Sequence, residues 1–295
     1  MNELVFHRYH GLGNDYLVCQ RQVADRLTNQ QIQRICDRHY GLGSDGLLID
    51  VEDVAIPTLR IINPDGSEAE KSGNGLRIYA RYLFDIGRVS HLPFHVNTLG
   101  GQVRCEVTEG AHQVIVDMGH ANFTPSALPA LVAGEEALTL PLLIDGHKLS
   151  ATLVSMGNPH CVIHVNKLDL ALVKALGGKI ATLPIFPKRA NVQFVEVQDR
   201  NNLSIGIWER GAGYTLASGS SSCAAASAMR KRGLIDDNVT VQMPGGQLAI
   251  SFSGDFQVRM CGPVQKISTS ILDEECFFDM PSDPETGVRH AIPSA

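Results

Sequence analysis

The chain has 295 residues, which is long enough for two domains that each bury a core. Hydrophobic residues make up 44% and charged residues 19% of the sequence, and this balance excludes a disordered chain or a coiled coil. The net charge of -6 provides no broad positive field, so we expect no nucleic-acid partner. No run of about 18 apolar residues occurs, and Glu3 and Arg8 interrupt the N-terminal segment where a secretion signal needs an apolar core. We therefore expect a cytoplasmic protein without a membrane span.

The seven cysteines are scattered and include no Cys-x-x-Cys pair, which argues against a disulfide framework. The eleven histidines show no His-Glu-x-x-His or comparable spacing. The sequence therefore predicts no structural zinc and no other metal site.

The first half of the chain reads as short strands around two helices. Asn63-Pro64-Asp65-Gly66 is a strong turn signal between a strand and the second helix. A Pro- and Ala-rich connection is expected at 124–134. In chain order the expected elements are a strand at 4–6, a helix at 29–39, strands at Leu47–Val51 and Thr58–Ile62, a helix at 76–83 and antiparallel strands from 95 to about 118.

The second half repeats this scheme in the same order. Strands are expected at 150–155, 190–197 and 203–208, with a helix at 168–176 and another after Ser218. Ser72-Gly73 and Ser218-Gly219 are 146 residues apart, the difference between positions 218 and 72, which is close to half the chain. We predict two related domains, residues 1–125 and 126–280, followed by a loose tail at 281–295.

A literal G-x-G-x-x-G occurs at residues 41–46. A dinucleotide-binding fingerprint follows a strand and opens a helix, whereas here a helical pattern precedes the glycines and a strand-like run follows them. We interpret this motif as a turn from a helix to a strand.

The two Ser-Gly pairs each stand at the start of an expected helix. Serine is a common N-cap and glycine a common turn residue, so this pattern alone needs no function. The polar clusters upstream, at 63–70 and 208–213, are not explained in that way. Two helix N-termini facing one cleft would offer free N–H groups to one carboxylate, an arrangement suited to an amino-acid substrate.

At this point the chain resembles the diaminopimelate epimerase family nearly from end to end. Each motif alone is weak, but six in the family's order form a strong match. They are His10-Gly11-Leu12-Gly13-Asn14-Asp15, Asp37-Arg38-His39-Tyr40-Gly41-Leu42-Gly43, residues 63–77, Val154-Ser155-Met156-Gly157-Asn158-Pro159-His160, Asn191-Val192-x-Phe194 and Trp208-Glu209-Arg210-Gly211-Ala212-Gly213-x-Thr215-Leu216.

The resemblance implies an α/β (α+β) fold of two pseudo-symmetric domains. Each would be a mostly antiparallel sheet wrapped around a central helix, with the active site in the interdomain cleft. It also implies an isomerase that needs no cofactor, pyridoxal included, and inverts the α-carbon of an amino acid with one acid and one base. The implied partner is a small-molecule amino acid, and because family members are often dimers a homodimer is an expected state.

The family's pattern also assigns site residues. The catalytic positions are Ser72 and Ser218. The α-carboxylate would meet the N–H groups of Gly73, Asn74, Gly219 and Ser220. Glu209 would take the distal ammonium and Asn14 would line the pocket, and the distal end of a diaminopimelate-like substrate would meet Asn63, Asn158, Asn191 and Arg210.

Both catalytic positions depart from the family, which has cysteine where this chain has Ser72 and Ser218. A serine hydroxyl is far less acidic than a thiol and rarely acts as a base without an activating neighbour. Three explanations stay open: deliberate substitution to trap a complex, a natural serine variant with altered chemistry, or a binding protein that has lost turnover. Lys71 and the serines at 220–222 also differ from a typical epimerase, which favours a natural subgroup.

Four other side chains are weighed for a role in the chemistry. We interpret Cys223 as a small core residue, and Lys71, His160 and Glu70 as candidate activators or bases whose alternative roles are capping or packing. Two further functions stay open beside the epimerase. One is an isomerase like the phenazine-biosynthesis members of the broader fold, and the other is an amino-acid-binding protein without turnover.

Overall fold

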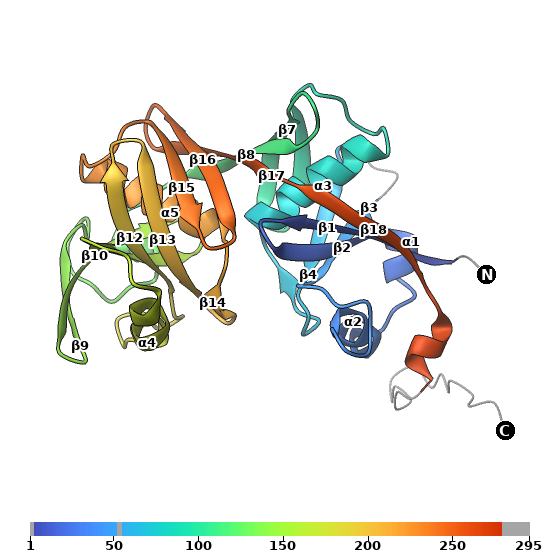
Figure 1. Ribbon diagram of the computed structural model, residues 1–295, viewed down its shortest axis with the longest axis horizontal. Helices are drawn as coiled ribbons and strands as arrows, with labels where there is room; N and C mark the ends of the chain where they lie inside the picture. Colours follow the sequence, from blue (N-terminus) through green and yellow to red (C-terminus); the bar gives the residue numbers. More distant parts are fainter. Residues whose placement is uncertain (1–2, 52–54, 279–295) are drawn as a thin grey trace. The chain divides into compact units, whose positions relative to one another are not determined.

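The computed structural model describes residues 3–51 and 55–278 and separates into two compact units. The first unit runs to Val114 and resumes at Val264, and the second spans Ile115–Pro263. The predicted division at 125/126 therefore differs, as does the placement of residues 264–280. The physical reason is that β18 (Gln265–Leu272) pairs antiparallel with β1 (Leu4–Gly11), which returns the chain to its first unit (Figure 1). The predicted tail lies outside the described residues.

The sheet of the first unit is mostly antiparallel. Its strand order is β18-β1-β2-β3-β4-β6-β7, and only the β2/β3 and β4/β6 pairs are parallel. The short β5 pairs with β4 beside this order. The remaining strands are β2 (Asn14–Gln20), β3 (Leu47–Val51), β4 (Thr58–Ile62), β5 (Glu68–Ala69), β6 (Phe94–Thr98) and β7 (Gly101–Val107).

The sheet of the second unit has the order β9-β10-β11-β12-β13-β15-β16-β17-β8. Its parallel pairs are β11/β12 and β13/β15, and the short β14 pairs with β13. The strands are β8 (Gln113–His120), β9 (Leu140–Ile144), β10 (His147–Ser155), β11 (Pro159–Val165), β12 (Asn191–Asp199), β13 (Asn202–Glu209), β14 (Gly213–Thr215), β15 (Asn238–Met243), β16 (Gly246–Ser253) and β17 (Gln257–Pro263).

The helices stand at equivalent places in the two units, which confirms the predicted repeat. The helices α2 (Asn29–Cys36) and α4 (Leu170–Ala181) each join the two strands of the first parallel pair. The helices α3 (Gly73–Asp85) and α5 (Gly219–Lys231) each precede the second strand of the other parallel pair. The shorter elements are α1 (Arg21–Ala24), η1 (Pro125–Ala127) and η2 (Glu274–Phe277).

The helices α3 and α5 are the buried centres of their units. In α3 every residue from Gly73 to Ala80 is buried, and α3 contacts β1, β2, β3 and β7. In α5 the buried run extends from Ser221 to Met229 and packs on seven strands, helped by alanines that allow close approach. Figure 1 shows α3 lying across the strands of the first unit.

Both central helices also end in the same way. In α3 the N–H of Gly87 donates to Phe84 O and that of Arg88 to Leu83 O, and Gly87 has a φ of +74°. Gly233, 146 residues later, ends α5 with the same pair of bonds and a φ of +73°. This left-handed glycine ending satisfies the last carbonyl groups of each helix. The offset of 146 residues predicted at the helix starts therefore holds at the helix ends too.

Two predicted helix ranges were wrong, one at its C-terminal end and the other at both ends, since α4 begins at Leu170 rather than at 168. The helix α2 ends at Cys36 rather than at 39, because the carboxylate of Asp37 accepts the N–H groups of His39 and Tyr40 in a separate turn. The helix α4 continues to Ala181 rather than stopping at 176. Its Gly177 does not end it, because this glycine lies against Trp208, where an added Cβ would stand 2.6 Å from the Trp208 Cβ.

The G-x-G-x-x-G segment joins α2 to β3, so its interpretation as a helix-to-strand turn is confirmed. A Cβ at Gly41 would lie 1.9 Å from Arg34 O, and Gly43 has a φ of +73°. These glycines are needed for the path of the backbone rather than for a nucleotide.

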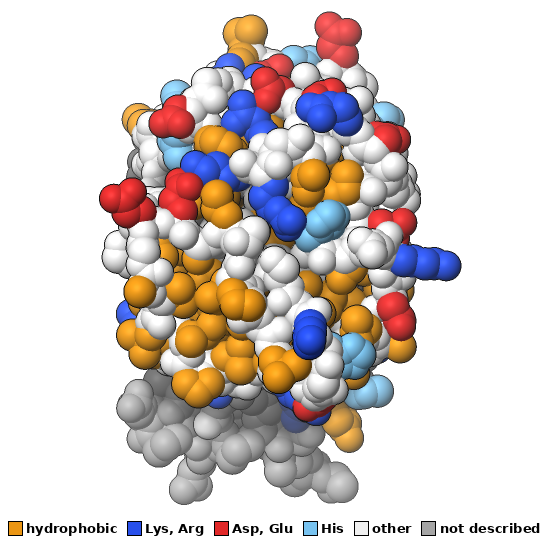
Figure 2. Space-filling model, turned by 90° about the vertical axis from the view of Figure 1, so that its left-hand side faces the viewer, with side chains coloured by type: hydrophobic (Ala, Val, Ile, Leu, Met, Phe, Trp, Pro, Cys, Tyr) orange, Lys and Arg blue, Asp and Glu red, His pale blue; other side chains and the backbone are white. Residues whose placement is uncertain are grey.

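Apolar side chains also reach the surface of the second unit. Figure 2 shows them gathered on the face that carries β9 and α4. Leu143 of β9 is 69% exposed, and Leu131 is 71% exposed. Among the helices of the described residues, none has the length and apolar character needed to span a membrane.

Candidate functional site

Ser72 is the N-cap of α3, and its hydroxyl oxygen accepts a hydrogen bond from the helix. Its Oγ accepts a hydrogen bond from the N–H of Gly75 at 3.0 Å, and its carbonyl oxygen accepts from Leu76 N at 2.8 Å. Because the hydroxyl oxygen is the acceptor in this cap, the hydroxyl proton is left to be donated. Ser72 is half-buried, and Gly73 and Asn74 beside it are buried.

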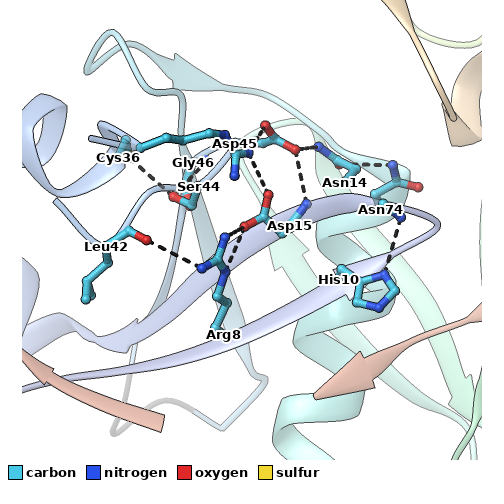
Figure 3. Close-up of polar contacts among 12 residues, drawn as sticks. Arg8, His10, Asn14, Asp15, Cys36, Leu42, Ser44, Asp45, Gly46 and Asn74 are labelled. Atoms are coloured by element: carbon cyan, nitrogen blue, oxygen red, sulfur yellow. Dashed lines mark hydrogen bonds and ion pairs between the residues drawn. The ribbon is translucent and has the colours of Figure 1, made fainter. Parts of the chain in front are cut away.

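Asn14 and Asn74, both predicted to bind substrate, lie side by side. The amide nitrogen of Asn74 donates to Asn14 Oδ1 at 3.0 Å, and Asn74 Oδ1 accepts from Arg77 Nη2 at 2.7 Å. Arg77 is fully buried in the first turns of α3. The structure therefore joins the β1–β2 turn to the start of the central helix (Figure 3).

A charged network behind Asn14 holds it in place. Asp45 Oδ2 accepts from Asn14 Nδ2 at 2.7 Å and from the N–H of Asp15 at 3.1 Å. Asp15, only 5% exposed, receives Arg8 on one oxygen and Arg38 on the other (Figure 3). Asp45 was not predicted from the sequence, although it lies inside the glycine-rich segment 41–46, which was noticed there. This turn brings the Asp45 carboxylate within hydrogen-bonding distance of Asn14.

The first unit contains three other candidate residues, Asn63, Lys71 and Glu70, and none of them is fully buried. Asn63 lies at the end of β4, where its Nδ2 donates to Ser67 Oγ at 3.0 Å within the predicted turn. Lys71 is half-buried, and Glu70 is exposed with its carbonyl accepting from Gly100 N. Their roles stay predictions.

Ser218 is the N-cap of α5 but differs from Ser72. Its side chain makes no capping hydrogen bond, in contrast to the matching position of α3. Its carbonyl oxygen instead accepts both the N–H of Ser222 at 3.1 Å and the hydroxyl of Ser222 at 2.8 Å. Gly219 is buried and Ser220 half-buried. The two serine positions are equivalent in the repeat but not in their hydrogen bonding.

The half-buried Asn158 stands at the end of a chain of buried polar side chains in the second unit. His160 Nε2 lies 2.8 Å from Asn158 Oδ1, and His160 Nδ1 lies 3.1 Å from Gln193 Nε2. The same Gln193 nitrogen donates to Ser221 Oγ at 3.0 Å, which connects the chain to α5. Gln193 and Ser221 were not predicted from the sequence, since a buried glutamine leaves no periodic signal.

Asn191 acts as a brace between two segments of the predicted site. Its Oδ1 accepts the N–H of Arg210 at 2.8 Å, and its Nδ2 donates to Pro159 O at 3.2 Å. It therefore ties the residue after β13 to the segment that carries Asn158. Three predicted residues, Asn158, Asn191 and Arg210, are thus brought together in the second unit.

The Arg210 side chain is exposed. Its guanidinium makes one long hydrogen bond, from Nη1 to Lys188 O at 3.4 Å, and it forms no salt bridge with any of the described residues. The alternative of a structural ion pair is therefore not seen here. Glu209, the preceding residue and last of β13, is half-buried.

Burial bears on the roles considered for His160 and Cys223. Burial lowers the pKa of His160 to about 3, with a small opposing effect of Gln193 and a further lowering by Arg210. His160 is therefore neutral at ordinary pH, and both of its ring nitrogens are engaged, which argues against a role as proton acceptor. Cys223 is fully buried, which confirms its interpretation as a core residue.

The candidate residues of each unit are rich in groups that can donate hydrogen bonds. In the first unit these are the N–H groups at the start of α3 and the amides of Asn14 and Asn74, and in the second they are the N–H groups at the start of α5, the amide of Asn158 and the guanidinium of Arg210. All of these groups can donate to a carboxylate. Among the described residues there is no cluster of three or more His, Cys, Asp or Glu side chains that could hold a metal ion.

Comparisons with known proteins find relatives along most of the chain. The sequence profile of diaminopimelate epimerase matches residues 6–124 and 152–267. The chain is 44% identical over 275 residues to diaminopimelate epimerase 2 of Nostoc sp., with 92% of this chain and 96% of that protein covered. It is 41% identical to the diaminopimelate epimerase of Pseudomonas entomophila, covering 90% and 97%.

Solved structures with the same fold have low sequence identity. A hydroxyproline epimerase from Agrobacterium vitis matches with a TM-score of 0.62 at 15% identity, over 91% of this chain and 90% of that one. A phenazine biosynthesis protein of the PhzF family from Bacillus anthracis matches with a TM-score of 0.63 at 16% identity, over 92% and 99%. At such low sequence identity these matches show that the fold is shared.

The buried neutral state of His160 predicts how stability depends on pH. Its folded pKa is about 3 and its ordinary value 6.5, so below pH 6.5 the unfolded chain binds a proton that the folded chain does not. The stabilising contribution is complete above pH 6.5 and is lost as the pH falls, by up to about 1.4 kcal/mol per unit. Urea unfolding of the native chain and of His160→Gln, at pH 6.5 and about pH 5, should show a difference in pH dependence of about 2 kcal/mol.

The matched control is His147→Gln, which changes an exposed histidine on β10. It should keep the pH dependence of the native chain. An equal pH dependence in the native chain and in His160→Gln would contradict the buried neutral state.

Proposed function

Because the chain belongs to the diaminopimelate epimerase family, we propose that it inverts an α-carbon of a diamino-dicarboxylic amino acid such as diaminopimelate. The proposed enzyme is an isomerase that works without pyridoxal. The observation that carries the proposal is the pair of 13-residue helices that begin directly after Ser72 and Ser218, at equivalent places of the repeat. A homodimer and a cytoplasmic location stay predictions of the sequence.

We propose that the α-carboxylate binds the first N–H groups of α3 and α5, at Gly73, Asn74, Gly219 and Ser220. These groups have no partner inside the helix, and the positive ends of the helix dipoles favour an anion. Loss of the α-proton places further negative charge on the carboxylate. Fixed donors aimed at this charge therefore lower the barrier more than they stabilise the bound substrate.

The far end of the substrate would bind in the second unit. Arg210 can hold a carboxylate with two parallel hydrogen bonds, and Asn158 adds an amide beside it. The brace through Asn191 supports this assignment, because it fixes both segments to one another. Glu209 would take the distal ammonium, while Asn63 and Asn14 are proposed to line the pocket.

The reaction breaks one C–H bond at the α-carbon and forms another on the opposite face. The base then holds one proton more and the acid one proton fewer, and exchange with water restores both. A base removes the α-proton from one face and leaves a carbanion stabilised by the adjacent carboxylate, and an acid then protonates the opposite face. Ser72 can donate its hydroxyl proton, because its oxygen already accepts from Gly75 N. Proton removal by a serine is slow without an activating neighbour, so we expect the native chain to turn over slowly.

The serine positions can be tested by replacing both with cysteine. Ser72→Cys with Ser218→Cys supplies two groups whose pKa lies near the working pH, and the rate of inversion should rise by roughly 10²-fold or more. Each single change should raise it much less, since two faces need two groups. The measurement is chiral chromatography of LL- and meso-diaminopimelate incubated with each variant.

A suitable control is Ser227→Cys, which changes a buried serine in the middle of α5. It should leave the rate unchanged. No gain in the double variant would remove the serines as the cause of slow turnover. The pocket as a whole would then suit a different isomerisation, or binding without turnover.

The distal carboxylate predicts a specific effect at Arg210. Arg210→Lys keeps the charge but loses the two-bonded geometry, so binding of diaminopimelate should weaken by about 1 to 3 kcal/mol. Titration calorimetry measures this change directly. The control Arg200→Lys alters an exposed arginine paired with Asp236 and should bind as the native chain does. Unchanged affinity in Arg210→Lys would argue against a dicarboxylic substrate.

A further inference from the structure

The second unit contains a continuous chain of four polar side chains that ends at Asn158. We call Ser221, Gln193, His160 and Asn158 the Gln193 relay. Gln193 and His160 are completely buried, as is Ser221. They come from α5, β12 and β11, and the relay is therefore fixed by the packing of the central helix on its sheet.

The direction of each hydrogen bond follows from the chemistry of its partners. The amide nitrogen of Gln193 can only donate, so His160 Nδ1, 3.1 Å away, must accept. A neutral imidazole that accepts at Nδ1 carries its proton on Nε2. The Nε2–H group then donates to Asn158 Oδ1 at 2.8 Å. This leaves the NH₂ group of Asn158 as the group available to a ligand.

The opposite direction is also self-consistent. If the Gln193 amide were reversed, its oxygen would accept from the Ser221 hydroxyl and from a proton on His160 Nδ1. His160 Nε2 would then accept from Asn158, which would present its carbonyl oxygen instead. Since the histidine is neutral, its single proton must sit on one nitrogen, and all members of the relay reverse together.

The placement of the Gln193 amide nitrogen between His160 Nδ1 and Ser221 Oγ favours the first of these two directions. Ser221 Oγ accepts from Gln193 Nε2 at 3.0 Å, and Gln193 Oε1 is buried without a hydrogen-bond partner in the described ranges. A buried carbonyl oxygen without a partner destabilises a fold by about 1 to 3 kcal/mol. In the reversed direction the NH₂ group of Gln193 would take this place and would leave its N–H groups without a partner instead.

From this geometry we infer that Gln193 is a positioning residue which, through the His160 tautomer, makes Asn158 a hydrogen-bond donor and so selects a carboxylate over an ammonium. Asn191 adds an independent argument, because it bonds to Arg210 N and to Pro159 O on either side of this chemistry. A guanidinium and an amide NH₂ on braced segments are both donors. The inference rests on the proposed function only in taking Asn158 as a substrate-binding residue.

The first test is the tautomer in the native chain, which needs no substrate. Long-range ¹H–¹⁵N correlation spectra of the ¹⁵N-labelled protein at pH 7 identify the protonated nitrogen of each neutral histidine, and His160→Gln assigns the signal. The expected result is a proton on Nε2. A proton on Nδ1 would overturn the inference whatever the activity of the enzyme.

The second test reverses the relay with Gln193→Glu, which keeps the size of the side chain. A carboxylate accepts, so the proton of His160 should move to Nδ1 and Asn158 should turn its oxygen to the ligand. The dissociation constant for LL-diaminopimelate, measured by calorimetry, should rise roughly tenfold or more, with KM rising and kcat changing less. A second variant, Gln193→Met, should give both tautomers and an intermediate affinity.

The control is Gln198→Glu, which changes an exposed glutamine of the same strand that also donates to a serine, Ser204. It should keep both tautomer and affinity. A switched tautomer with unchanged affinity would overturn the selection of a carboxylate. If the native chain shows the expected tautomer and binds diaminopimelate but never inverts it, the proposed function fails while the inference about Gln193 stands.

Discussion

The start of a fully buried helix is the constraint on which this structure depends. The first N–H groups of any helix lack partners within it, and a buried start cannot leave all of them to water. In α3 burial begins at the first residue, Gly73, and in α5 at Gly219. Each unit must therefore provide polar groups at this place, or admit an anion that satisfies several N–H groups at once. The repeat imposes the same requirement twice.

The two units surround the first N–H groups of their central helices with different polar side chains. In the first, Ser72 caps the helix, and a charged network from Arg8 to Asp45 supports Asn14 and Asn74. In the second, the Ser218 side chain makes no cap, and a neutral buried relay through His160 reaches Asn158. The two units of the repeat therefore differ. In the first, charged side chains support the asparagines, and in the second the direction of the hydrogen bonds depends on which nitrogen of His160 carries its proton.

Much of the fold was readable from local pattern. The bounds of β3 and β4 were predicted to the residue, because alternating apolar runs and the turn at Asn63 mark them directly. The strand β18 was assigned to the wrong half because its partner, β1, lies about 260 residues away, and no local signal reports such pairing. The helix α4 passed through two glycines because Trp208 occupies the space beside them, which is a tertiary effect.

The candidate site residues were assigned from the motifs of the family, whereas the side chains that support them were not predicted. The substrate contacts of Asn14, Asn158 and Arg210 come from this resemblance and stay predictions. The supporting roles of Asp45, Gln193 and Asn191 depend on which atoms face one another after folding. Burial also removed one candidate, because a neutral His160 with both nitrogens engaged is a poor base.

The central claim is that this chain, with serine at both reacting positions, still exchanges the α-proton of its substrate. The most direct measurement follows LL-diaminopimelate in D₂O with the native chain by ¹H NMR and chiral chromatography. The account predicts slow loss of the α-proton signal, together with appearance of the meso isomer carrying one deuterium at the inverted carbon. Binding without any exchange, or deuterium found only at another carbon, would contradict it.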